Sequence, residues 1–138
     1  MKHRFLTVFF ALLITSLLGC SKAPYANVSN SELESLLKEN VTLIDIRRPE
    51  EWKQTGVVKG SHLITLFDGQ GRLVESFFDK LGSVVKDKET PVVLICRTGN
   101  RTQAGSQMLV ENLGFKTVYN VTNGITGWIS EGREVEKR

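Results

Sequence analysis

The chain has 138 residues and a formal net charge of +3, and 24% of its residues are charged. Two of the basic residues, Lys2 and Arg4, lie in an apolar leader; without residues 1–19, 16 basic residues face 15 acidic ones. This near-neutral balance gives no reason to expect nucleic acid or an acidic surface as a partner. The remaining residues, about 119, suffice for one hydrophobic core and one domain.

The leader has the layout of a secretory signal peptide. Basic residues near its start are followed by an apolar run over residues 5–18, and the run ends in small residues. This run is shorter than the roughly 18 residues or more that suggest a membrane-spanning helix. We therefore expect residues 1–19 to be removed, and an uncleaved N-terminal anchor helix is the alternative.

The end of the leader, LLGC at residues 17–20, resembles the lipobox of bacterial lipoproteins. The resemblance implies that Cys20 carries a lipid such as palmitate and that residues 20–28 tether a domain over residues 29–138 to a membrane. It also implies a periplasmic protein, and Ser21 after the cysteine is typical of sorting to the outer membrane. If Cys20 carried no lipid, a disulfide with Cys96 would be the alternative in an oxidising compartment.

The first half of the domain predicts short helices between short strands. Residues 28–40 combine early acidic residues with an apolar stripe, which indicates a helix capped by Ser29 or Ser31. Residues 41–46 are β-branched and mostly apolar, as expected of a strand buried on both faces. The next two predicted elements are a proline-led helix over residues 47–56 and a strand near residues 62–66.

The second half continues the alternation. An amphipathic helix is predicted over residues 72–85, with an apolar side made of Leu73, Phe77, Phe78 and Leu81. Residues 90–96 form the most hydrophobic strand of the domain. The remaining predicted elements are a helix from near Arg101 to Gly114, a strand over residues 115–121 and a short helix over residues 124–132. This order predicts an α/β domain of three layers, with a central, largely parallel sheet flanked by helices.

Cys96 stands at the carboxyl end of the most hydrophobic strand, where open α/β sheets bind their ligands. A tight loop follows before the next helix, and its Gly99 and Asn100 tolerate the positive φ values that turn successive N–H groups inward. A helix N-terminus and the guanidinium groups of Arg97 and Arg101 favour the thiolate, which is the nucleophile. The pattern predicts a catalytic thiol; a buried structural cysteine is the alternative.

The segment LICRTGNRTQAG, residues 94–105, closely resembles the active-site segment of single-domain rhodaneses, whose loop typically reads Cys-Arg-x-Gly-x-Arg. Three further stretches resemble the same family in the same order: TLIDIRRPEEW, TGVVKGSHLI and NVTNGITGWISEG. The resemblance implies a rhodanese-like fold. It also implies a sulfurtransferase that moves a sulfane sulfur from a donor such as thiosulfate to cyanide or a thiol through a persulfide.

Carried over to this chain, the resemblance makes Cys96 the nucleophile and persulfide carrier. The backbone N–H groups of the loop are expected to bind the terminal sulfur, and they belong to Arg97, Thr98, Gly99, Asn100 and Arg101. Arg97 is expected to attract the anionic donor, and Asp45 to pair with a loop arginine and so support the loop. The expected partners are the small donor and acceptor and, through the lipid, a membrane; no metal or organic cofactor is implied.

The main enzymatic alternatives require a loop of a different length. Cysteine phosphatases and arsenate reductases of this fold use a Cys-x5-Arg loop, whereas four residues separate Cys96 from Arg101 here. The shorter ring favours a single sulfur over a tetrahedral phosphate. His62 has no evident partner ligand, so we do not predict a metal site. Two non-enzymatic hypotheses stay open: a sulfane-sulfur or redox-sensing binding module, and a tethered interaction domain with little turnover.

Overall fold

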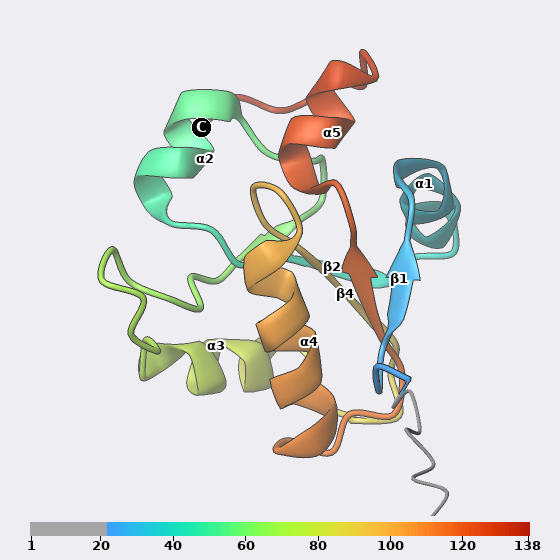
Figure 1. The fold of residues 1–138 in the computed structure, drawn as a ribbon, viewed down its shortest axis with the longest axis vertical. Coiled ribbons are helices and arrows are strands. Elements are labelled where there is room, and N and C mark those ends of the chain that lie inside the picture. The colour runs from blue at the N-terminus through green and yellow to red at the C-terminus, as the bar shows by residue number, and fades with distance from the viewer. Residues whose placement is uncertain (1–21) are drawn as a thin grey trace, which may run out of the picture.

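A computed structural model describes residues 22–138 of the chain (Figure 1), so the leader and Cys20 lie outside the described residues. Five strands form one sheet in the order β1-β5-β4-β2-β3, and every adjacent pair is parallel. The strands are β1 (Ala26–Val28), β2 (Thr42–Asp45), β3 (His62–Leu63), β4 (Val92–Ile95) and β5 (Val118–Val121). The predicted α/β class and parallel sheet are confirmed.

Helices cover both faces of this sheet. They are α1 (Asn30–Lys38), α2 (Pro49–Thr55), α3 (Ser76–Val84), α4 (Asn100–Glu111) and α5 (Gly124–Ser130). Phe77 of α3 and Leu109 of α4 pack into one hydrophobic cluster, whereas Leu33 of α1 and Ile125 of α5 pack into another. Figure 1 shows α3 and α4 on one side of the strands and α1 on the other. The domain therefore has the predicted three layers.

β4 is the centre of the core. All four of its side chains are fully buried, and successive residues enter opposite clusters: Val92 and Leu94 face α3 and α4, and Val93 and Ile95 face α1 and α5. Burying side chains of this size stabilises a fold by about 1.5–3 kcal/mol each. The strand is thus a rigid support for the residue that follows it, Cys96.

The first helix begins where the sequence predicts, and the structure selects between its two candidate caps. The Ser29 hydroxyl accepts a hydrogen bond from the Glu32 N–H at 3.2 Å, and the Glu32 carboxylate accepts one from the Ser29 N–H at 2.7 Å. This reciprocal pair is a capping box, which satisfies two backbone donors that the helix leaves free.

The predicted tether is wrong in its last three residues. Ala26–Val28 form strand β1, which pairs with Tyr119–Val121 of β5, and the Asn120 amide donates to the Asn27 side chain at 2.8 Å. This segment is too short and too polar to show a strand period, and Val28 is its one buried side chain. The folded unit therefore starts by Ala26 rather than at residue 29.

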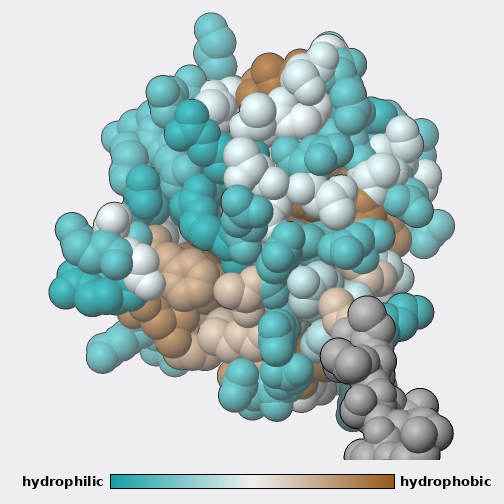
Figure 2. Space-filling model, in the orientation of Figure 1, coloured by the Kyte–Doolittle hydropathy of each residue, from teal (hydrophilic) through white to brown (hydrophobic). Residues whose placement is uncertain are grey.

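The third helix is shorter than predicted. Leu73 and Val74 stay outside the helix because Phe67 and Leu73 form an antiparallel bridge and the Val74 N–H donates to the Leu66 carbonyl at 2.9 Å. Phe77 and Leu81 are buried as predicted, but Leu73 and Phe78 are 42% and 38% exposed. Figure 2 shows an apolar area on the face where α3 and α4 lie. Within residues 22–138, no helix has the length and apolar character needed to cross a bilayer.

Candidate active site

The loop that carries Cys96 is a turn between β4 and α4. Gly99 has a φ of +95°, and a Cβ at this position would collide with the backbone carbonyl of Thr122. Only glycine fits both conditions without strain. The loop is therefore closed tightly enough for α4 to begin at Asn100, four residues after the thiol.

The sulfur of Cys96 lies inside this turn. Its residue is 1% exposed, and the Gly99 N–H donates a hydrogen bond to Sγ at 3.2 Å. The Thr102 hydroxyl lies 3.5 Å from Sγ and donates to the Gly99 carbonyl at 2.8 Å. Sequence reasoning missed Thr102; the only available signal was its place three residues after Gly99, one helical turn along.

Helix α5 holds the loop from one side through its backbone. The N–H groups of Ile125 and Thr126 donate to the carbonyls of Cys96 and Arg97 at 2.9 and 3.1 Å. Gly124 approaches those same carbonyls with a φ of +54°, and a Cβ there would collide with both. Because the carbonyl and the N–H of a trans peptide point in opposite directions, these bonds turn the Arg97 and Thr98 N–H groups away from α5.

Helix α2 holds the loop from another direction through a side chain. The Glu51 carboxylate accepts hydrogen bonds from both terminal nitrogens of Arg101, at 2.8 and 2.6 Å. It also accepts the Arg48 N–H at 3.0 Å. Glu51 is almost buried, with 8% of its side chain exposed, and 25% of the Arg101 side chain is exposed. Sequence reasoning gave Glu51 no role, because only the fold turns it, and not Glu50, toward the loop.

The charges of this pair perturb one another. Burial by itself would raise the pKa of Glu51, but hydrogen bonds from Arg101 and from the Arg48 N–H, together with both arginine charges, lower that pKa to about 2. The hydrogen bonds to Glu51 raise the pKa of Arg101 against the opposing effect of burial, and the negative charges of Glu51, Cys96 and Asp45 add to the rise. Arg101 is a permanent cation close to the thiol.

Asp45 does not pair with a loop arginine, so that prediction is wrong. Its carboxylate binds Arg47 at 2.6 Å, and both side chains are fully buried. Arg47 also donates to the Thr55 hydroxyl at 2.7 Å and to the Gly56 carbonyl at 2.9 Å. The pair therefore fixes α2 against the end of β2 and supports the loop only through α2 and Glu51.

The remaining predicted loop residues point to solvent. Arg97, Thr98 and Asn100 are exposed. In the part of the chain that the structure describes, the Arg97 guanidinium has no hydrogen-bond or ion-pair partner, in contrast to Arg101. The loop thus combines the buried thiol of Cys96, the Arg101 guanidinium, which is paired with Glu51, and the Arg97 guanidinium, which is exposed.

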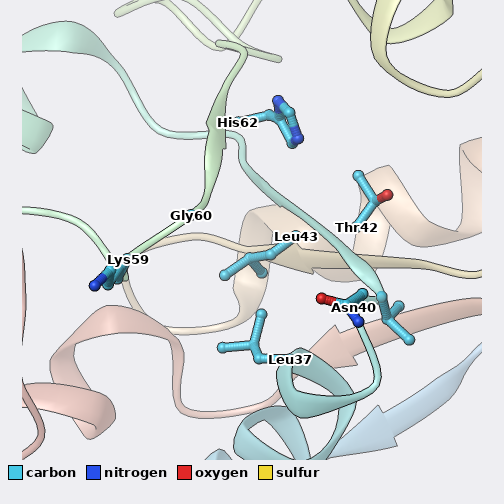
Figure 3. A pocket seen from close by; sticks show the side chains of 8 residues that line it. Leu37, Asn40, Thr42, Leu43, Lys59, Gly60 and His62 are labelled. Carbon is cyan, nitrogen blue, oxygen red and sulfur yellow. The ribbon is translucent and has the colours of Figure 1, made fainter.

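A separate hollow of about 250 Å³ lies beside α1, β2 and β3 (Figure 3). Its lining includes Leu37, Asn40, Thr42, Lys59 and His62. Thr42 pairs with Val92 at the start of the central strands, whereas Cys96 follows their carboxyl ends, so the hollow is not part of the thiol site. Among residues 22–138 no three His, Cys, Asp or Glu side chains lie close enough together to hold a metal ion.

Residues 29–131 match the rhodanese-like domain family, and the chain belongs to this family. Among its relatives, the thiosulfate sulfurtransferase GlpE of Pseudoalteromonas translucida is 32% identical over 96 residues, which are 70% of this chain and 80% of that protein. An uncharacterized protein of Rickettsia prowazekii is 30% identical over 93 residues, 67% of this chain and 75% of the relative.

Solved structures show the same fold. The polysulfide-sulfur transferase homodimer of Wolinella succinogenes has a TM-score of 0.65 and 32% sequence identity, over 85% of this chain and 82% of that one. The Rv0390 protein of Mycobacterium tuberculosis has a TM-score of 0.68 with 23% identity, over 83% of this chain and 99% of its own, which supports the fold alone.

Proposed function

We propose that this protein is a sulfurtransferase that carries sulfane sulfur as a persulfide on Cys96. The observation that carries the proposal is the thiol at the end of β4, with the Gly99 N–H on its sulfur and the Arg101 guanidinium close by. A backbone donor aimed at sulfur stabilises negative charge there, and this applies to a thiolate and to a persulfide anion. The likeness to a thiosulfate and to a polysulfide-sulfur transferase agrees with this chemistry.

The reaction takes two steps. The Cys96 thiolate attacks the outer sulfur of thiosulfate, an S–S bond forms to Cys96, and the S–S bond of the donor breaks as sulfite leaves with the electron pair. An acceptor such as cyanide or a thiolate then attacks the terminal sulfur. The bond to Cys96 breaks, the cysteine thiolate is regenerated, and thiocyanate or a new persulfide departs. No external oxidant or reductant is required.

The acceptor must come from outside the domain. Cys96 is the one free cysteine among the residues that the structure describes. Internal resolution of the persulfide into a disulfide therefore has no partner thiol there. Arg97, exposed at the start of the loop, supplies the charge that attracts an anionic donor.

We also propose that the mature protein is a periplasmic lipoprotein anchored through Cys20, on the grounds of its leader and lipobox-like sequence. The sheet supports an orientation for such an anchor. β1 follows the tether directly. Because all strands of the sheet are parallel, they start at the same end of the sheet, and Cys96 lies beyond the opposite end, where β4 finishes. An anchored domain would present its thiol loop away from the membrane.

The test is thiocyanate release from thiosulfate and cyanide by the full-length protein in detergent, beside its Cys96→Ala variant. We expect turnover, and a mass increase of one sulfur atom after thiosulfate alone, both lost in the variant. Folded, reduced protein that neither gains sulfur nor forms thiocyanate would contradict the proposal. For the anchor, a Cys20→Ala protein that still incorporates palmitate and stays in membranes would contradict lipidation at that residue.

The burial of Cys96 favours one second candidate, a sulfane-sulfur carrier or redox-sensing module. The Cys96 residue is 1% exposed, which limits access to its sulfur, so a loaded persulfide would persist until a specific partner reached it. Sulfur loading by thiosulfate without release to cyanide distinguishes this candidate from the enzyme.

A further inference from the structure

The two arginines of the thiol loop are in different states. Both terminal nitrogens of Arg101 donate to the Glu51 carboxylate, and 25% of the Arg101 side chain is exposed. Arg97 is exposed and has no side-chain partner among residues 22–138. A guanidinium binds a carboxylate or another oxyanion through the same fork of N–H groups, so a fork held by Glu51 is not available to a substrate.

Glu51 is itself held in place. The Arg48 N–H donates to its carboxylate at 3.0 Å, and the buried Arg47 donates to the Glu51 carbonyl at 3.4 Å while it binds Asp45. The carboxylate therefore cannot follow Arg101 if that side chain turns toward solvent. Its sequence neighbour Glu50 has the opposite setting: it is 66% exposed on its side chain and pairs with Arg48 at the surface.

We propose that Glu51 is a positioning residue for sulfur transfer, which fixes the Arg101 guanidinium beside the Cys96 loop and withholds it from the incoming anion. Arg97 alone then receives the donor. This inference rests on the proposed function at Cys96. In this arrangement Arg101 is a fixed positive charge that orders the loop. The thiosulfate oxygens bind to the Arg97 guanidinium and not to that of Arg101.

The first experiment compares Glu51→Gln with the matched control Glu50→Gln in thiosulfate:cyanide sulfur transfer. Loss of the carboxylate charge lets Arg101 leave its position, so kcat should fall by roughly tenfold or more. The released guanidinium can bind thiosulfate, so KM for thiosulfate should fall by roughly two- to fivefold. Glu50→Gln should change neither constant. Unchanged kcat and KM in folded Glu51→Gln protein would overturn the proposal, and so would a higher KM.

A double-mutant cycle shows whether Glu51 acts through Arg101. If it does, the Glu51→Gln/Arg101→Gln protein should turn over no more slowly than Arg101→Gln alone, because the second change removes a group whose partner is already gone. Multiplied losses of kcat in the double variant would mean that Glu51 acts by another route. Thermal unfolding of each variant separates this coupling from a loss of folded protein.

A second measurement does not depend on sulfur transfer. The rates at which iodoacetate and uncharged iodoacetamide alkylate Cys96 give a ratio that reports positive charge accessible to an anion. Arg97→Gln should lower this ratio several-fold, and the Glu51→Gln/Arg101→Gln double variant, which removes the paired charges together, should leave it nearly unchanged. Equal losses would overturn the assignment. If wild-type protein transfers no sulfur but shows this contrast, the proposed function fails, while the assignment of Arg97 as the guanidinium open to an anion and of Arg101 as the guanidinium held by Glu51 stands.

Discussion

Helices α2 and α5 hold the same loop by different means. α5 uses backbone N–H groups, which bind the Cys96 and Arg97 carbonyls and carry no titratable proton in the working range of pH. α2 uses the carboxylate of Glu51 on the guanidinium of Arg101, an interaction that depends on charge. The contact with α2 is therefore sensitive to pH and to substitution of a single side chain, whereas the contact with α5 is sensitive only to changes in backbone geometry.

We expect the greatest loss of stability from a substitution that breaks the buried ion pair between Asp45 and Arg47, which fixes α2. Arg47→Met leaves the Asp45 carboxylate buried without its partner, so we expect the free energy of unfolding to fall by about 3–5 kcal/mol. Arg72→Met is the matched control, because Arg72 is 75% exposed on its side chain and its pair with Asp68 lies at the surface. Urea denaturation of both variants measures the difference, and equal losses would contradict a structural role for the buried pair.

The next effect tests the α5 side. Gly124→Ala combines strain at a φ of +54° with a collision against the carbonyls that α5 binds, so we expect a loss of about 2–4 kcal/mol. Gly132→Ala is the control, because its φ of +73° has the same strain but no atom lies within 4 Å of the added Cβ. It should cost about 1–2 kcal/mol. If both variants lose the same stability in urea, the close approach of Gly124 to the loop contributes nothing.

The pH dependence of stability distinguishes the α2 contact from the α5 contact, because only the α2 contact contains a titratable group. The pKa of Glu51 is lowered from 4.5 to about 2, so its stabilising contribution is complete above about pH 4.5 and is lost as the pH falls through about 2. Urea denaturation of wild type and Glu51→Gln should therefore show a stability difference that is constant from pH 6 to about pH 4.5 and narrows from there toward pH 2. A difference that stays constant down to pH 2 would mean that the carboxylate charge is not what binds Arg101.

The smallest expected effect concerns the hydroxyl beneath the sulfur. Thr102→Val keeps the shape of the side chain but removes the donor to the Gly99 carbonyl, so we expect a loss of about 1 kcal/mol. Thr98→Val, at an exposed position in the same loop, is the control and should be near neutral. Thermal unfolding compares the two, and a neutral Thr102→Val would show that Gly99 alone holds the turn.

Local patterns predicted most of the fold. The apolar run of β4 and the serine before α1 act through their immediate neighbours, so they are readable along the chain. Strand β1 could not be predicted, because three residues are too few to show the alternation of a strand. The role of Asn27 depends on a hydrogen bond from Asn120 on the adjacent strand. The predicted length of α3 was wrong for a similar reason, since contacts with residues 66 and 67 keep Leu73 and Val74 out of the helix.

The thiol, the glycine turn after it and the family of the chain could be identified from residues that are next to one another along the chain. The arginine partners of the two buried carboxylates could be found only from the folded structure. Asp45 ends β2 and Glu51 lies in the first turn of α2, and nothing in their order shows that one binds Arg47 and the other Arg101. That choice depends on where α4 and α2 meet, which is set by packing across the sheet and not by the local sequence.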